Sequence, residues 1–98
     1  MLFFIFCEDH DNTAQLRREI RETHLAYIRE FEDHILVGGP TLAPDAETMD
    51  GTFMIIDLPD RHAVDDFLAG DPYNRAGMFR KITVKPWRLV RLVAPSAE

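Results

Sequence analysis

The chain has 98 residues, of which 46% are hydrophobic and 29% charged, and this suits one globular domain with a thin core. Its formal net charge of -6 does not supply the basic surface that nucleic acid requires, and no apolar run is long enough to cross a membrane. The single cysteine, Cys7, excludes an internal disulfide and, with no secretory signal in the sequence, favours the cytoplasm.

The first two predicted elements are a strand and a long amphipathic helix. Residues 2–7, LFFIFC, are aromatic and β-branched, which predicts the strand. Asn12 or Thr13 could cap the helix, which is expected to run to about Asp33. Its apolar side chains recur every three or four residues and predict one buried stripe, opposite a solvated charged face. The stripe contains Leu16, Ile20, Tyr27, Ile28, Phe31 and Ile35, and the charged face contains Arg17, Arg18, Arg21, Glu22, Arg29 and Glu30.

The middle of the chain predicts two further strands separated by a loop. Residues 35–42, ILVGGPTL, predict a short strand that ends at the Gly-Gly-Pro triplet of residues 38–40. Residues 43–51 predict the loop, and its Asp50-Gly51 pair is expected to turn the chain into a strand over residues 52–58.

The last predicted elements are a second helix and a long strand. Pro59 and Asp60 are expected to begin the helix, and Gly70 is a natural stop for it. Residues 80–93 predict the final strand, in which Pro86 marks an edge, a bend or a bulge.

The predicted order is therefore β-α-β-β-α-β, which is typical of a ferredoxin-like α+β fold. Two right-handed crossovers place both helices on one face of a four-stranded antiparallel sheet. Residues 1–93 are expected to form this single domain, followed by a frayed tail over residues 94–98. The strands at residues 2–7 and 52–58 are apolar on both faces, so the helices leave one apolar face bare. We therefore expect a second copy of the chain to cover that face in a homodimer.

His24 is the most informative candidate for a functional residue. It lies on the apolar stripe, four residues after Ile20 and four before Ile28, so its ring is expected to point toward the sheet. The alternative is a structural histidine that donates a hydrogen bond to a backbone carbonyl in the core.

Asp71 is the second candidate, because the residue before a proline is held away from the helical region. Its carboxylate is therefore expected on a stiff stretch of backbone just after the second helix. Asp71 could also cap a short helical turn that starts at Pro72, and the two roles are compatible. If Asp71 meets His24, it orients the imidazole and stabilises the protonated ring, which suits acid–base catalysis near neutral pH.

Other groups of reactive residue types are weaker candidates. CEDHD, residues 7–11, contains metal-ligand residue types without a paired motif, so a solvated acidic loop is favoured over a metal site. Cys7 has no histidine at a recognised nucleophile spacing and is expected to be a buried, inert thiol. The final strand is basic, which indicates an edge that resists aggregation, a match for the acidic loop, or capture of an anionic substrate. Its basic residues are Arg80, Lys81, Lys85, Arg88 and Arg91.

Four short motifs, in their order along the chain, resemble the YciI-like (YCII-related) family of the dimeric α/β-barrel superfamily. They are THLAYI on the first helix, GGPTL after it, DPY after the second helix and KPW on the last strand, so the resemblance covers nearly the whole chain. It implies a ferredoxin-like fold that pairs as a dimeric barrel. It also implies a candidate active site centred on His24 and Asp71. The nearby positions that it implies for substrate binding are Gly39, Pro40, Pro72 and Tyr73.

The resemblance also bears on the chemistry, since some YciI-like proteins are associated with dehydrohalogenation of aromatic breakdown products. We expect a small cytoplasmic enzyme in which His24 and Asp71 act as an acid–base dyad on a small cyclic or aromatic-derived substrate, by elimination or isomerisation. Such a reaction needs neither a metal nor a cofactor, and neither nucleic acid nor a membrane is expected as a partner. The alternatives are a non-catalytic module that binds a small ligand and a purely structural dimerising domain.

Overall fold

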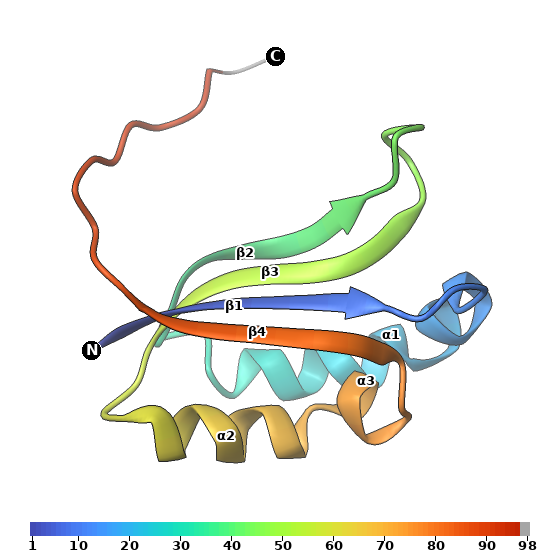
Figure 1. Ribbon diagram of the computed structural model, residues 1–98, viewed down its shortest axis with the longest axis horizontal. Helices are drawn as coiled ribbons and strands as arrows, with labels where there is room; N and C mark the ends of the chain where they lie inside the picture. Colours follow the sequence, from blue (N-terminus) through green and yellow to red (C-terminus); the bar gives the residue numbers. More distant parts are fainter. Residues whose placement is uncertain (97–98) are drawn as a thin grey trace.

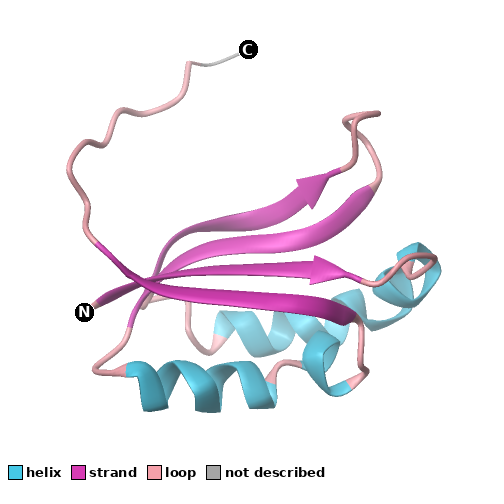
Figure 2. Cartoon of the chain, viewed as in Figure 1, coloured by secondary structure: helices cyan, strands magenta, loops and turns pink. Residues whose placement is uncertain are grey.

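The computed structural model describes residues 1–96, which form one antiparallel sheet with helices on one of its faces (Figure 1, Figure 2). The order of strands across the sheet is β2-β3-β1-β4. This is the ferredoxin-like α+β fold that the order of elements predicts, with α3 as an added single turn before the last strand. The strands are β1 (Leu2–Asp9), β2 (Ile35–Leu42), β3 (Met49–Asp57) and β4 (Phe79–Trp87), and the helices are α1 (Ala14–Arg29), α2 (Arg61–Gly70) and α3 (Pro72–Arg75).

The hydrophobic core lies between the helices and the sheet. Side chains of β1 alternate between the two faces, and Phe3, Ile5 and Cys7 are buried on the helical side. They pack against β3 and α2 in one contiguous cluster, as the amphipathic pattern of both helices requires. The other members of the cluster are Met54, Ile56, Leu58, Val64, Phe67 and Leu68.

Each edge strand of the sheet contains a proline. Pro40 lies in β2, paired with Thr52 of β3, and Pro86 lies in β4, paired with Phe3 of β1. An edge strand tolerates proline because its outer N–H groups are not needed for pairing. The edge interpretation of Pro86 is therefore confirmed, whereas the prediction that the strand ends at residues 38–40 is wrong, since β2 continues to Leu42.

Two predicted boundaries in the first half of the chain need correction. α1 ends at Arg29, before the predicted end near Asp33, because the chain then changes to tighter turns in which the N–H of Phe31 donates to the carbonyl of Ile28. The Asp50-Gly51 pair lies inside β3. The chain reverses earlier, at Asp45, whose carboxylate accepts hydrogen bonds from the backbone N–H groups of Glu47 and Thr48.

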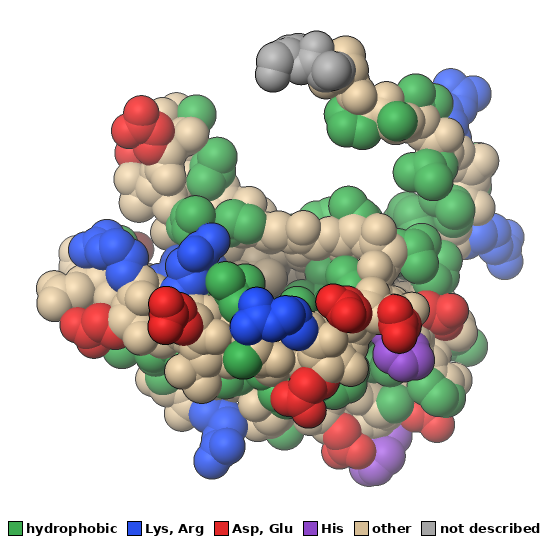
Figure 3. Space-filling model, turned by 180° about the vertical axis from the view of Figure 1, so that it is seen from behind, with side chains coloured by type: hydrophobic (Ala, Val, Ile, Leu, Met, Phe, Trp, Pro, Cys, Tyr) green, Lys and Arg blue, Asp and Glu red, His purple; other side chains and the backbone are tan. Residues whose placement is uncertain are grey.

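The predicted end of the last strand is also wrong, because β4 ends at Trp87 and not at residue 93. Trp87 pairs with Leu2, the first residue of β1, so β4 ends level with the start of its partner strand. Residues 88–96 leave the sheet without regular secondary structure (Figure 1). Residues 97 and 98 of the expected tail lie outside the described residues. Residues 88–96 carry several exposed hydrophobic side chains (Figure 3), namely Leu89, Val90, Leu92 and Val93.

The lengths and compositions of the helices show whether any of them could cross a membrane. Among residues 1–96, no helix is both long enough and apolar enough to cross a bilayer.

Candidate active site

His24 and Asp71 meet between α1 and the junction of α2 with α3. The Nδ1 atom of His24 lies 2.8 Å from Oδ1 of Asp71, and the exposed fractions of the two side chains are only 9% and 3%. A carboxylate accepts hydrogen bonds, so Nδ1 carries the proton and donates it. This arrangement leaves Nε2 as the ring nitrogen that can exchange a proton with a bound molecule.

Asp71 is held in place by its backbone and by a second hydrogen bond. It follows the last residue of α2 with an extended backbone, as expected for the residue before Pro72. Its Oδ1 atom also accepts the backbone N–H of Tyr73 at 3.0 Å, which caps α3. The capping role and the contact with His24 therefore coexist on the same oxygen atom, and both donors restrict its rotation.

Tyr73 forms a wall beside the dyad. Its ring stacks on the His24 imidazole with a centroid distance of 3.9 Å and an interplanar angle of 16°. Burial raises the pKa of Tyr73, while the positive charges of Arg17 and Arg21 oppose that shift. The phenol therefore stays protonated at neutral pH, so its contribution is packing rather than proton abstraction.

Arg17 lies inside the protein, contrary to the expectation from the sequence. It was expected on the solvated face of α1, but its side chain is only 5% exposed. Its guanidinium donates to both carboxylate oxygens of Asp9, at 2.9 and 3.0 Å, and to the hydroxyl of Thr52 at 3.0 Å. It also lies 4.6 Å from the centre of the Tyr73 ring. Arg17 is seven residues before His24, which is two helical turns and the same side of α1.

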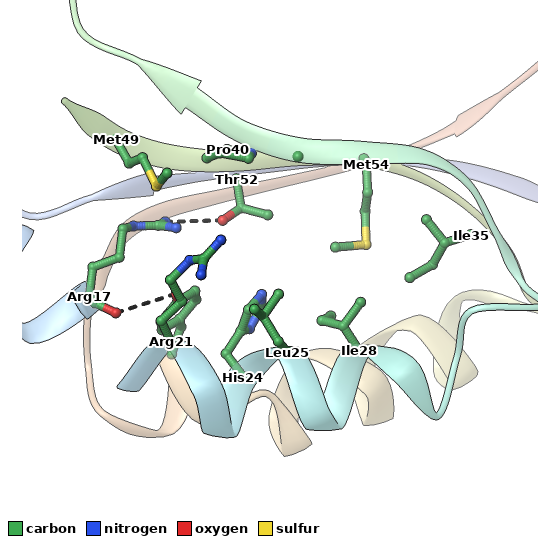
Figure 4. Close-up of a pocket in the computed structure, with 13 residues that line it drawn as sticks. Arg17, Arg21, His24, Leu25, Ile28, Ile35, Pro40, Met49, Thr52 and Met54 are labelled. Atoms are coloured by element: carbon green, nitrogen blue, oxygen red, sulfur yellow. Dashed lines mark hydrogen bonds between the residues drawn. The ribbon is translucent and has the colours of Figure 1, made fainter. Parts of the chain in front are cut away.

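A pocket of about 180 Å³ opens between α1 and the β2–β3 half of the sheet (Figure 4). This volume suits a small molecule, because a cavity of about 150 Å³ already holds one benzene ring. In Figure 4, Thr52 and Met54 point down from the sheet, while Arg21, His24 and Ile28 rise from α1. His24 therefore presents its ring to a space that a single-ring ligand can fill.

The positions implied for substrate binding fall into two groups. Gly39, Pro40 and Tyr73 line the pocket together with His24. Asp71 is not in the pocket lining, but it contacts the His24 imidazole, which is. Pro72 begins α3 and also lies outside the pocket lining. The contribution of Pro72 is to fix the backbone of Asp71.

The remaining reactive residue types have structural partners. The expectation of a solvated loop is wrong for Glu8 and Asp9, because both belong to β1 and Asp9 is buried against Arg17. Glu8 lies 3.2 Å from Arg80, and this pair is the charge match with the basic last strand. Burial, and then the negative charges of Asp71 and Asp9, raise the pKa of Cys7 to about 12, which keeps the thiol protonated. Among residues 1–96, no three His, Cys, Asp or Glu side chains are grouped so that they could hold a metal ion.

Comparison with known proteins identifies relatives along nearly the whole chain. The family model of the YCII-related domain matches residues 1–88. An uncharacterized protein of Haemophilus influenzae is 34% identical over 97 residues, covering 92% of this chain and 99% of its own length. Protein YciI of Escherichia coli O6:H1 is 29% identical over 97 residues, with the same coverage of 92% and 99%.

Two solved structures share the fold. One is the 5-chloro-2-hydroxyhydroquinone dehydrochlorinase TftG from Burkholderia phenoliruptrix, in complex with 2,5-dihydroxybenzoquinone. It is 34% identical, with a TM-score of 0.83, and the match covers 90% of this chain and 94% of TftG. An antibiotic biosynthesis monooxygenase is 18% identical, with a TM-score of 0.56 over 93% of this chain and 100% of its own, and this likeness concerns the fold alone.

Proposed function

The chain belongs to the YCII-related domain family, and from this premise we propose that it is a small cytoplasmic enzyme in which His24 and Asp71 form an acid–base dyad. The observation that carries the proposal is the 2.8 Å contact between their side chains at the wall of a pocket. A carboxylate on Nδ1 fixes the tautomer that leaves the Nε2 lone pair free, and it stabilises the imidazolium that forms when Nε2 accepts a proton.

The proposed reaction begins with transfer of a substrate proton to Nε2 of His24. In an elimination, the electron pair left by that proton forms a new π bond while the leaving group departs with its own bonding pair. In an isomerisation, the pair moves within the substrate and the imidazolium returns the proton to another atom. Asp71 stays ionised throughout and balances the charge of the imidazolium.

The size of the pocket and the comparisons support a small cyclic or aromatic-derived substrate. A pocket of about 180 Å³ accommodates one ring rather than an extended molecule. The likeness to a dehydrochlorinase supports elimination of a halide from a halogenated hydroquinone as the first reaction to test.

The test is a turnover screen on chlorinated hydroxyhydroquinones and related lactones, with chloride release and product absorbance as readouts. His24→Ala and Asp71→Asn should each lower the rate roughly a hundredfold to ten-thousandfold, because acid–base catalysis contributes on that scale. Asparagine keeps the helix cap, so Asp71→Asn should fold normally. The double variant should be scarcely slower than either single one, since two residues that act as one unit are not additive.

The matched control is His62→Ala, because the His62 side chain is 85% exposed and lies outside the pocket. This variant should retain full activity. Should wild-type protein bind members of the screen without turning any over, the protein is a ligand-binding module and the enzymatic proposal is wrong. If His24→Ala mainly lowers the free energy of unfolding and leaves ligand binding intact, His24 is a structural histidine.

A further inference from the structure

The pocket is positively charged, although the protein as a whole is acidic. Within the described residues, its lining includes Arg17, Arg21 and His24 but no aspartate or glutamate. The chain as a whole has a formal net charge of -6. A local excess of cationic groups in an acidic protein indicates that the site receives negative charge.

Arg21 is the source of the excess positive charge in the pocket. Arg17 is neutralised by its two hydrogen bonds to Asp9, and the carboxylate of Asp71 faces His24. Arg21, in contrast, forms no ion pair within the part of the chain that the structure describes. Its guanidinium extends from α1 toward the sheet, beside the space that the pocket occupies (Figure 4).

The pocket also changes in polarity along α1. Its end near the start of the helix has the guanidinium of Arg21 and the hydroxyl of Thr52, whereas its other end has the aliphatic side chains of Ile28 and Ile35 (Figure 4). His24 lies between the two ends. A ligand that fits both ends has an ionised oxygen on one side of a small apolar body.

We propose that Arg21 binds the ionised oxygen of a single-ring substrate, and so determines both the charge that the site accepts and the orientation of the ring. The oxygen belongs to a phenolate, an enolate or a carboxylate, since the planar guanidinium pairs with any of these. The apolar side of the ring then packs against Ile28, Ile35 and Met54. This inference rests on the proposed function only in taking the same pocket as the substrate site.

The position of Arg21 also suits the proton transfer. When His24 removes a proton, a negative charge develops on the substrate, and a guanidinium already aimed at that charge stabilises it without rearrangement. Arg21 is three residues before His24 on the same helix, so the base and the cation lie on the same side of α1. One bound molecule can therefore give its proton to His24 while its negative charge pairs with Arg21.

The experiment measures binding of para-nitrophenol, whose phenolate absorbs differently from its phenol, and compares it with nitrobenzene, which has no ionisable group. Wild-type protein should bind the phenolate in preference to nitrobenzene and should lower the pKa of the bound probe. Arg21→Gln should weaken phenolate binding about tenfold to a hundredfold, the usual worth of a hydrogen bond to a charged group. Binding of nitrobenzene should not change. Arg21→Lys keeps the charge and should retain part of the preference.

The matched control is Arg29→Gln, because Arg29 and Arg21 are both exposed arginines of α1 but Arg29 lies outside the pocket. It should bind both probes as the wild-type protein does. Equal phenolate binding by Arg21→Gln and Arg29→Gln would overturn the inference, as would a wild-type protein with no preference for phenolate. Because these measurements need no turnover, they are independent of the activity of His24→Ala and Asp71→Asn, which tests the enzymatic proposal.

Discussion

At the scale of single residues, the site depends on which polar side chains are taken out of water and what they meet there. His24 interrupts an apolar stripe and Asp71 precedes a proline, and both signals are visible in the sequence. These signals single out each residue, and the expectation that the two meet rests also on both helices covering one face of the sheet and on the family resemblance.

Arg17 could not be placed by the same reasoning, because a periodic pattern assigns long charged side chains to the outside by default. The seven-residue spacing from His24 was the available signal, together with Asp9, which shares the helical face of β1 with Cys7. Buried ions need excellent partners to offset their desolvation. Only the structure supplies that pairing, with two hydrogen bonds from Arg17 to Asp9 and one to Thr52.

Cys7 leads to a prediction about alkaline pH. Burial, Asp71 and Asp9 raise its pKa from 9.0 to about 12, so above about pH 9 the unfolded chain loses the thiol proton while the folded chain keeps it. The contribution of Cys7 to the free energy of unfolding is therefore complete below about pH 9 and declines as the pH rises toward 12. The free energy of unfolding, measured with urea across this pH range, should fall more steeply with pH for the wild-type protein than for Cys7→Ala.

The wild-type protein and Cys7→Ala are compared by how steeply the free energy of unfolding changes with pH, and not by its value at any one pH. Cys7→Ala also removes a buried sulfur atom, which lowers stability at every pH by a similar amount. Parallel curves for the two proteins would contradict a raised pKa.

At the scale of elements, the sequence predicts which helices and strands exist better than where they end. Strand ends are decided by the partner strand, and no local pattern contains that information. β4 ends at Trp87, which pairs with Leu2, the first residue of β1, and β2 continues past Pro40 because it is an edge. Helix starts were easier, since Asp60 caps α2 through the N–H of Ala63, as its sequence suggests.

The packing of α2 on α1 provides a prediction at Gly70. A Cβ atom there would lie 2.9 Å from Cζ of Tyr27 and closer still to its hydroxyl oxygen, which donates to the carbonyl of Phe67. Glycine to alanine normally stabilises a helix by about 1 kcal/mol. Here Gly70→Ala should instead lower the free energy of unfolding by about 1–3 kcal/mol, the usual cost of overpacking. Chemical denaturation measures the difference.

Gly39→Ala is the matched control for Gly70→Ala, because a Cβ atom at Gly39 has no atom within 4 Å. Its stability should be close to that of the wild-type protein. If Gly70→Ala is as stable as Gly39→Ala, Tyr27 moves aside without cost and the close packing of the two helices is not a constraint.

At the scale of the whole molecule, the two faces of the sheet differ in what covers them. The helices cover one face, and charged side chains gather over that helical layer (Figure 3). On the other face, a row of Phe4, Ile55 and Val37 runs from β1 through β3 to β2. Ile55 is buried at 2% exposure and Phe4 is half-buried, whereas Val37 is 54% exposed. An exposed apolar side chain such as Val37, on a sheet face that no helix covers, is a candidate contact for another protein surface.

We propose that a second copy of the chain covers this bare face in a homodimer. Light scattering at micromolar concentration should give twice the 11.3 kDa mass of one chain. Val37→Glu places a charge in the proposed interface and should shift the protein to monomer, because an unpaired carboxylate is costly to bury. Ala26→Glu adds the same charge at an exposed position of α1 and should remain dimeric. A monomeric wild-type mass, or the same mass for both variants, would contradict an interface on this face.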